Sequence, residues 1–497
     1  MRRATASPFT SSPIHFFTVL LLCVCVISSG CTAERTGAAS AAQQPQVLAP
    51  KSEVIVDWAR VNEEAVGKLS DYLRIESVNP PGNEDRGVEW LKKIFDAEGI
   101  AYETAESAPG RGNLVARLRG SGAEPALVLL HHIDVVPVNR EFWTVDPFGG
   151  EIKDGYIYGR GAMDMKGTGV AQLMAFLLLH RAKVSLKRDV ILLATADEEA
   201  GGEFGAGWIV RNRPQWIEGA GFLLNEGATS AAGRDGRVQY IGVGPTEKSP
   251  AWLKLTARGT PGHGSIPRPD SAVNRLVAAL ERLRTWETPL EVTPPVEAAL
   301  RSLAPFEPEP WRTHYSNIRA FVDRPGARAE LAQRPGVLAL LTNTVSITGL
   351  EGTNKINIIP PAASALVDTR LLPGWTIESW VREVKRVIRD DSIQVEVVLN
   401  FPPAVSSTDT PLYRAIEAAV KKIHPEAGVA QTVLAGFTDS HFFRDRGIVS
   451  YGFGAFPVAG FDSARVHGND ERIPVKSFTD GVRLTWEVVY NFVRAEY

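Results

Sequence analysis

Imidazole and carboxylate side chains are concentrated in four short segments of this sequence. The segments read "HHIDVVP", "GRGAMDMKG", "ADEEAGG" and "NEG". The residues of interest in them are His132, Asp134, Asp164, Glu198, Glu199 and Glu226. Histidine and carboxylate ligands without cysteine are typical of catalytic metal ions, and a carboxylate can also act as a general base. The residue types therefore suggest a catalytic metal site.

Each segment taken alone has an ordinary structural explanation. A His-x-Asp sequence is often a hydrogen-bonded pair, an Asp-Glu-Glu run is often a solvated turn, and an aspartate among glycines often caps a turn. Their joint placement argues against these explanations, because converging carboxylates repel one another unless cations lie between them. Two zinc ions and a bound hydroxide would balance the charges of Asp164, Glu199 and Glu226. Cobalt or manganese would suit the same ligands.

The elements that would position these residues are the strands of an α/β domain. The apolar runs "ALVLL", "DVILLAT" and "GFLLN" alternate with helix-like stretches such as "VEWLKKIFDAEGI". This alternation predicts a largely parallel sheet that is buried on both faces. In such sheets, functional side chains gather beyond the carboxyl ends of the strands. We therefore expect the four segments to meet at one edge of the sheet.

A different pattern begins near residue 246. "AWLKLTARGT", "NTVSITGLEG" and "AASALVDTRLL" resemble half-exposed strands, and "SAVNRLVAALERLRTW" and "TIESWVREVKRVIRD" have helical periodicity. The α/β pattern then returns with "PLYRAIEAAVKKIH". The sequence thus predicts an α/β domain made of residues 51–245 and 398–497. A smaller α+β domain, residues 246–397, interrupts it.

The N-terminal segment has the features of an export signal. Two arginines precede an apolar stretch that is too short to span a bilayer comfortably, and "SSGC" follows. This ending resembles the signal of bacterial lipoproteins, in which a cysteine, here Cys31, is lipidated. We expect residues 1–31 to be a signal peptide with a lipobox-like end and residues 32–50 to be a flexible tether. The protein would be exported and anchored by its lipid on the periplasmic or extracellular face of a bacterial membrane. Ordinary secretion and an uncleaved anchor are the alternatives.

Charge and composition restrict the class of partner. The chain has 497 residues, a formal net charge of -3 and 44% hydrophobic residues, which is an ordinary globular composition. A chain with this net charge lacks the positive electrostatic potential that attracts a polyanion, so no nucleic acid partner is expected. The three cysteines all lie in the N-terminal segment, so disulfides would not stabilise the mature chain.

The order of the motifs resembles a known family. "HHIDVVP", "GRGAMDMKG", "ADEEAGG", "NEG", "GTPGHGS" and "HGNDERIP" follow one another over nearly all of the chain after the tether. They are similar to the motifs of the dinuclear-zinc metallopeptidases that include aminoacylase, glutamate carboxypeptidase, acetylornithine deacetylase and Gly-X carboxypeptidase. The resemblance implies a zinc-peptidase catalytic domain with a lid of the dimerisation type. It also implies a small-molecule substrate and a possible homodimer through the lid.

The resemblance implies a role for each motif residue. The metal ligands would be His132 and Glu226 for one zinc ion, Glu199 and His467 for the other, and Asp164 as the bridge between them. Glu198 would be the general base. Asp134 would orient His132, since both side chains face the same side of a strand and the carboxylate can accept the second ring N–H. His131 and Asn225 stand where many relatives have other residues, and neither is expected to be a ligand.

The inserted domain would supply the residues that recognise substrate. By resemblance, His263 in "GTPGHGS" would stabilise the developing oxyanion, and in dimeric relatives it reaches the partner's site. Arg370 and Asn274 would grip a substrate carboxylate, a task that suits a guanidinium because it donates two parallel hydrogen bonds. The alternatives are a surface ion pair for Arg370 and a polar position on a helix face for Asn274. Asp439 and His441 in "GFTDSHFF" would lie near the substrate.

The predicted activity is hydrolysis of an amide bond next to a free C-terminal carboxylate, in an N-acyl amino acid or short peptide, by a zinc-bound hydroxide. The segments "DVVPV", "WTVDPFGG" and "IYGRGAMD" resemble most closely the Gly-X carboxypeptidase and N-fatty-acyl-amino-acid hydrolase branch. One alternative is an aminopeptidase or dipeptidase of the same fold. Arg370 argues against an aminopeptidase, which needs an acidic or carbonyl group for the substrate amine. A non-catalytic binding lipoprotein is the other alternative, and the complete ligand set argues against it.

Overall fold

The computed structural model describes residues 54–495 of the chain. The predicted signal peptide of residues 1–31 with Cys31, and the predicted tether of residues 32–50, lie outside the described residues. None of the helices in the described part is both long and apolar enough to cross a membrane.

The helices of the described residues are α1 (Trp58–Leu73), α2 (Asp85–Glu98), α3 (Lys166–Arg181), α4 (Ala206–Asn212), α5 (Ala272–Arg284), α6 (Pro294–Leu303), α7 (Trp311–Ser316), α8 (Ile318–Val322), α9 (Ala327–Leu331), α10 (Pro335–Leu340), α11 (Ile377–Ile388), α12 (Pro411–Ile423), α13 (Ser440–Arg444), α14 (Gly460–Ser463) and α15 (Val475–Val493).

The strands are β1 (Tyr102–Glu106), β2 (Gly112–Leu118), β3 (Ala126–His132), β4 (Ile152–Lys153), β5 (Tyr156–Tyr158), β6 (Val190–Thr195), β7 (Ala220–Asn225), β8 (Ala231–Ala232), β9 (Val238–Glu247), β10 (Ser249–Arg258), β11 (Gly262–His263), β12 (Thr344–Glu351), β13 (Ile358–Ile359), β14 (Ala362–Leu371), β15 (Gln394–Asn400), β16 (Gly428–Leu434), β17 (Val449–Phe453) and β18 (Arg472–Pro474).

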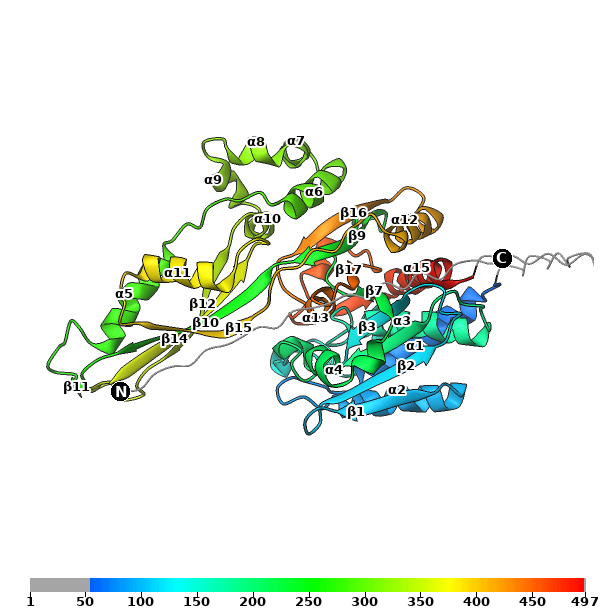
Figure 1. Cartoon of the computed structure of the whole chain (residues 1–497), viewed down its shortest axis with the longest axis horizontal. Coiled ribbons are helices and arrows are strands. Elements are labelled where there is room, and N and C mark those ends of the chain that lie inside the picture. Colours follow the sequence, from blue (N-terminus) through cyan, green and yellow to red (C-terminus); the bar gives the residue numbers. More distant parts are fainter. Residues whose placement is uncertain (1–53, 496–497) are drawn as a thin grey trace, which may run out of the picture. The chain divides into compact units, whose positions relative to one another are not determined.

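The main sheet has nine strands in the order β1-β2-β6-β3-β7-β17-β9-β16, with β8 paired to β9 (Figure 1). Its central pairs, β6 with β3, β3 with β7 and β7 with β17, are parallel. Antiparallel pairs lie outside them, at β1-β2-β6 on one side and at β17-β9 on the other. The predicted α/β class with a mostly parallel central sheet is confirmed.

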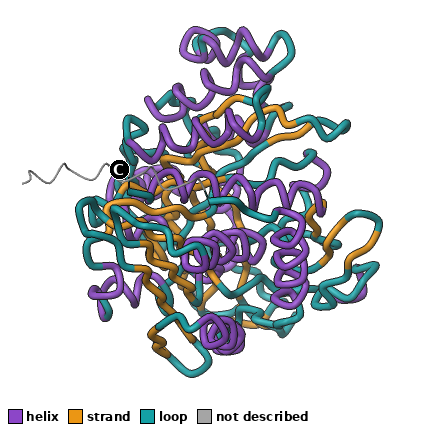
Figure 2. The backbone as a smooth tube through the Cα atoms, turned by 90° about the vertical axis from the view of Figure 1, so that its right-hand side faces the viewer, coloured by secondary structure: helices purple, strands orange, loops and turns teal. Residues whose placement is uncertain are grey.

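Strand β3 shows how this sheet separates two cores. Leu127 and Leu129 belong to the core that includes residues of α1, α2, α3, α12 and α15, whereas Val128 and Leu130 belong to the core that includes α4 and α13. Successive side chains of a strand point to opposite faces, so a wholly apolar strand needs cover on both. Figure 2 shows the helices and strands from a second direction.

A second sheet of four antiparallel strands, in the order β12-β14-β10-β15, lies within the inserted region. Helices α5 and α11 pack on it through residues such as Leu276 and Trp380. All four strands lie between Ser249 and Asn400, and the strands of the main sheet come before and after them in the chain. A sheet of its own fits the predicted lid, while its boundaries at residues 246–397 remain a prediction.

The Pro-rich stretch of the inserted region folds into five short helices, α6 to α10, which were not predicted from its pattern. Proline occupies the first turn of α6 and α10, where its missing N–H costs no intrahelical hydrogen bond. These helices form a core of their own, which also contains Val433 of β16. The Ser302 hydroxyl of α6 donates to the carbonyl of Gln431. The short helices therefore support one edge strand of the main sheet.

Candidate active site and metal centre

The four motif segments meet at one edge of the main sheet. β3 ends at His132, β7 ends one residue before Glu226, and β6 ends shortly before Glu198. These three strands are neighbours and parallel, so their carboxyl ends lie together. Asp164 comes from the loop that precedes α3, and His467 comes from the loop between α14 and β18. The sequence-predicted residues are thus brought to one place by five separate segments.

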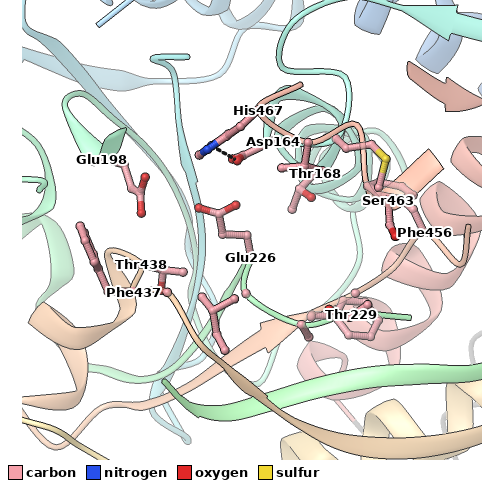
Figure 3. A pocket seen from close by; sticks show the side chains of 18 of the residues that line it. Asp164, Thr168, Glu198, Glu226, Thr229, Phe437, Thr438, Phe456, Ser463 and His467 are labelled. Carbon is pink, nitrogen blue, oxygen red and sulfur yellow. Dashed lines mark ion pairs between the residues drawn. The ribbon is translucent and has the colours of Figure 1, made fainter. Parts of the chain in front are cut away.

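Asp164 lies between two imidazole rings. Its Oδ1 is 3.2 Å from Nε2 of His132, and its Oδ2 is 2.8 Å from Nε2 of His467. His132 Nε2 also lies 3.2 Å from Oε1 of Glu226, and His467 Nε2 lies 3.4 Å from Oε2 of Glu199. Figure 3 shows the ion pair between His467 and Asp164. The cluster therefore consists of two sets of ligand atoms that share one carboxylate.

The donor set fits metal ions. The ligand atoms of His132, Asp164 and Glu199 all lie within 4.8 Å of one another, and so do those of His132, Glu198 and Glu226. Glu199 Oε1 is buried and has no hydrogen-bond partner among the described residues. Buried oxygens of this kind are normally satisfied, so a cation is a suitable partner for it. Nitrogen and oxygen donors without thiolate suit zinc, cobalt or manganese.

The pKa shifts in the cluster also indicate a site for cations. Burial, and then the negative charge of Asp164, raises the pKa of Glu226 to about 7. Burial likewise raises the pKa values of Glu198 and Glu199. Hydrogen bonds to Asp164 and Glu199 raise the pKa of His467 to about 10. The carboxylates thus draw in protons to offset their mutual repulsion, and metal ions would displace those protons.

Asp134 connects the metal-facing histidine to the two adjacent glutamates. Its carboxylate accepts the backbone N–H groups of Glu198 and Glu199, each at 3.1 Å, and the side-chain amide of Asn79 at 2.8 Å. Nδ1 of His132 lies 2.9 Å from the Asp134 carbonyl oxygen and 3.5 Å from the carboxylate. The carbonyl is thus the nearer of the two groups able to fix the ring, and the carboxylate also holds the turn of the glutamates.

A cavity of about 540 Å³ opens on the cluster (Figure 3). Its charged lining consists of Asp164, Glu198, Glu199, Glu226, Arg370 and His467. Its apolar lining includes Met163, Trp252, Leu434, Phe437, Phe453, Phe456, Val458 and Val466. Pockets of this size and composition hold small organic ligands. The aromatic and aliphatic residues of this wall carried no signal in the sequence, because they lie in several loops and strands.

Arg370 lines this cavity, but its guanidinium already has a carboxylate partner. Nε and Nη2 donate to the two oxygens of Asp368 at 2.7 and 3.0 Å. Nη1 is buried without a hydrogen-bond partner, and the guanidinium lies over the rings of Trp252 and Phe437. We expected the guanidinium to donate two parallel hydrogen bonds to a substrate carboxylate. In the structure, Asp368 accepts the hydrogen bonds of Nε and Nη2. The sequence "VDTRL" could have indicated the pair of Asp368 and Arg370, because residues two apart in a strand point to the same face.

His263 and Asn274 are not among the residues that line the cavity. His263 is exposed, and its Nδ1 accepts the backbone N–H of Ser265 at 3.1 Å. Asn274 is exposed on α5, and its amide donates to the Arg268 carbonyl at 2.9 Å. Within the described part of one chain, His263 and Asn274 therefore do not lie at the cluster.

Two other histidines beside the site are buried among ring systems. His131 lies next to the Tyr72 hydroxyl, and burial lowers its pKa to about 3. His441 stacks on Phe401, and burial lowers its pKa to about 3 as well. Both rings contact aromatic side chains, and neither residue lines the cavity. Asn225 is buried too, and its amide donates to the hydroxyl of Ser440.

The fold and the cluster define a metallohydrolase, because imidazole and carboxylate ligands converge beside a cavity at the carboxyl edge of an α/β sheet. The chain belongs to the peptidase family M20/M25/M40, whose profile matches residues 128–491. The family predicted from the motifs is thus confirmed, and with it a metal-dependent hydrolase.

The chain is 32% identical to the N-fatty-acyl-amino acid synthase/hydrolase PM20D1 of Xenopus tropicalis over 446 residues, which covers 86% of each protein. It is 28% identical to aminoacylase-1 of Sus scrofa over 430 residues, covering 84% of this chain and 93% of that enzyme. Among solved structures, an M20 family metallo-carboxypeptidase of Sulfolobus solfataricus superposes with a TM-score of 0.67 at 20% identity. That superposition covers 86% of this chain and 99% of the other, and it shows a shared fold.

Proposed function

We propose that this protein is a dinuclear zinc hydrolase that cleaves the amide bond of N-acyl amino acids next to a free carboxylate. The observation that carries the proposal is the position of Arg370, whose unpaired Nη1 shares one cavity with the imidazole and carboxylate cluster. The names of the relatives support it, since one acts on N-fatty-acyl-amino acids and another is an aminoacylase. Short peptides with a free C-terminus are the second substrate class.

The proposed ligands are His132 and Glu226 for one ion, Glu199 and His467 for the other, and Asp164 for both. Zinc is proposed on the ligand types, and cobalt or manganese would occupy the same positions. The bound ions would supply positive charge that polarises the scissile carbonyl and eases the deprotonation of a water molecule.

Glu198 is proposed as the general base. Its carboxylate lines the cavity and lies 3.9 Å from Nε2 of His132, farther than the oxygens of Asp164 and Glu226. It would take a proton from the attacking water and deliver it to the leaving amine. Burial raises the pKa of Glu198. A raised pKa brings a carboxylate closer to the pH range in which it can both accept and release a proton.

The cavity offers a separate surface to each end of the substrate. Arg370 Nη1 would donate one hydrogen bond to the substrate carboxylate. A second hydrogen bond would require Nη2 of Arg370 to leave Asp368. The apolar residues Phe456, Val458 and Val466 line the same cavity and would accept an apolar acyl group. We therefore expect N-acyl amino acids with longer acyl chains to be better substrates than N-acetyl amino acids.

The test is a matched substrate panel hydrolysed by the zinc-loaded full chain. The panel contains N-acyl amino acids of increasing chain length, dipeptides and the C-terminal methyl esters of both, each with and without chelator. We expect chelator-sensitive cleavage that is confined to free carboxylates and increases with acyl length. Equal cleavage of esters and acids would contradict the carboxylate recognition, and cleavage that survives full metal removal would contradict the metal mechanism.

His263 is proposed to act in the active site of a partner chain, within a homodimer formed through the lid. Its exposed position outside the cavity is compatible with this role. Mixing inactive Glu198→Ala and His263→Ala chains tests it, because a mixed dimer contains one site with both residues intact. We expect activity to return on mixing. Failure to recover activity, with mixed dimers present by mass spectrometry, would show that His263 does not act across the interface.

Export with a lipid on Cys31 is proposed on the sequence alone. The full chain expressed in a bacterium should incorporate labelled palmitate and fractionate with membranes. The Cys31→Ala chain should lose the label. Equal labelling of both chains would exclude Cys31 as the lipidated residue.

A further inference from the structure

Glu471 is a buried carboxylate that holds the loop of Asp164. Its Oε1 accepts the backbone N–H groups of Met163 and Asp164, at 2.9 and 3.1 Å. Its Oε2 accepts the N–H of Gly161 at 3.1 Å and Nη1 of Arg160 at 2.6 Å. Both Glu471 and Arg160 are almost fully buried. One side chain therefore satisfies three backbone donors and a guanidinium of a loop that lies some three hundred residues earlier in the chain.

The same pair also fixes the loop of His467. Glu471 follows His467 by four residues, and Nη2 of Arg160 donates to the carbonyl of Gly468 at 2.9 Å. The backbone N–H of Gly159 donates to the carbonyl of Glu471 at 3.0 Å, and β18 continues the contact by pairing with β5. The two loops are thus joined by backbone and side-chain hydrogen bonds in both directions.

His467 depends on this support more than His132 and Glu226 do. Its side chain is 53% exposed, and the ion pairs of its ring in the described structure are with Asp164 and Glu199. His132 and Glu226, in contrast, lie at the ends of β3 and β7, which pair directly in the main sheet. A loop ligand loses its position when its loop moves, whereas a ligand at a strand end is held by the sheet.

We propose that Glu471 and Arg160 are a positioning pair, which holds the Asp164 loop against the His467 loop and so assembles the ligand set of the second metal ion. The inference rests on the proposed metal centre and adds two residues to it. Neither side chain points a ligand atom at the cluster, so the pair acts through backbone position. Because Asp164 is proposed to bridge both ions, loss of the pair should weaken both. The second ion should be weakened more, since it also loses the position of His467.

The experiment titrates zinc into the metal-free full chain and into its Glu471→Gln variant by calorimetry, with a competing chelator. Glutamine keeps the shape of the side chain but replaces one of the two oxygens by an N–H₂ group. That group cannot accept the two hydrogen bonds that the replaced oxygen accepts in wild type. We expect wild type to bind two equivalents. In the variant the second equivalent should bind roughly 10–100-fold more weakly, as is usual for loss of a group that supports metal ligands. The absorption spectrum of cobalt-loaded protein should lose the contribution of the second ion.

Two further variants keep the result interpretable. Glu487→Gln is the matched control, because Glu487 is a buried carboxylate on α15 that pairs with Lys422 and Asn491. It should bind two zinc ions as wild type does. Arg160→Lys retains the positive charge and loses the second hydrogen-bonding arm to Gly468. It should weaken the second equivalent less than Glu471→Gln, and it provides the test if that variant does not fold.

The outcomes distinguish a failure of the positioning pair from a failure of the proposed metal centre. Two equivalents of wild-type affinity in a folded Glu471→Gln or Arg160→Lys chain would overturn the positioning role. Equal weakening of both equivalents would overturn it as well, because the pair also supports His467, which is proposed to bind the second ion alone. Absence of zinc binding by wild type would overturn the proposed metal centre itself, and the pair with it.

Discussion

His467 Nε2 lies 2.8 Å from Oδ2 of Asp164, while the other oxygen of the same carboxylate faces His132 at 3.2 Å. A carboxylate that presents one oxygen to each of two imidazoles has the arrangement needed to bridge two metal ions. The two hydrogen bonds, together with the charged rings, outweigh burial and lower the pKa of Asp164. Asp164 is therefore the ionised centre of a cluster whose other carboxylates are drawn toward their protonated forms.

Removal of metal should destabilise the protein as well as inactivate it. Ions that bind only the folded state stabilise it in proportion to the logarithm of their concentration, by about 4 kcal/mol at a thousand times the Kd. We expect the chelator-treated chain to unfold at a lower temperature and to lose turnover. Added zinc should restore both properties. An unchanged melting temperature in a preparation shown to be free of metal would contradict a metal centre built from these residues.

Replacement of Glu198 by alanine should separate metal binding from turnover. A positioned general base contributes roughly 10²–10⁴-fold to rate, so kcat should fall by about that factor. Two zinc ions should remain, because the carboxylates of Asp164 and Glu226 lie nearer to His132 than that of Glu198 does. Loss of one ion would instead assign Glu198 as a ligand, and full activity would exclude it as the base. Metal analysis and steady-state kinetics on one preparation decide between these results.

Asp368 and Arg370 should have opposite effects on substrate binding. Asp368→Asn weakens the partner that occupies Nε and Nη2, so the guanidinium becomes free to grip a substrate carboxylate with two bonds. We expect KM for free-carboxylate substrates to fall in this variant. Arg370→Met should raise KM by about tenfold or more, in keeping with the 1.5–3 kcal/mol typical of a charged hydrogen bond. Methyl esters are the internal control, because neither variant should cleave them any more than wild type does.

The sequence predicted the parts of the site that have local signals. The apolar runs of β3 and β6 are wholly buried, and so is the second half of β7. Polar residues follow each run closely, so both the parallel sheet and its functional edge could be predicted. The ordered motifs then located Asp164 and His467, which lie on loops without periodicity. The prediction of the sheet succeeded because burial on both faces of a sheet imposes a continuous apolar pattern.

Long-range partners could not be predicted in the same way. Glu471 stands inside the quoted motif "HGNDERIP", yet the groups that it binds lie more than three hundred residues earlier, and no local pattern encodes such a contact. The helices α6 to α10 were missed because each is only five to ten residues long and prolines punctuate them. Short helices of this kind are stabilised by tertiary packing, here against β16, more than by their own propensity.

Lys248 connects the short helices to the strands that lead into the second sheet. It lies between β9 and β10, is fully buried, and its Nζ donates to the carbonyls of Ala339 and Thr342, each at 2.8 Å. Burial, reinforced by the nearby Arg370 guanidinium, lowers the pKa of Lys248 from 10.5 to about 7. An amine with this shift makes the stability of the fold depend on pH.

The sign of that dependence follows from proton counting. Between pH 7 and the ordinary pKa of lysine, the unfolded chain keeps the Lys248 proton while the folded chain releases it. Stability conferred by this residue therefore rises with pH in that window, with a slope of up to about 1.4 kcal/mol per pH unit. The Lys248→Met chain lacks the slope, so wild type should gain stability relative to it from pH 7 to pH 9 in urea unfolding. Replacement of the exposed Lys385 on α11 by methionine should leave the slope unchanged. A pH-independent difference between wild type and Lys248→Met would show that Lys248 keeps its proton in the fold.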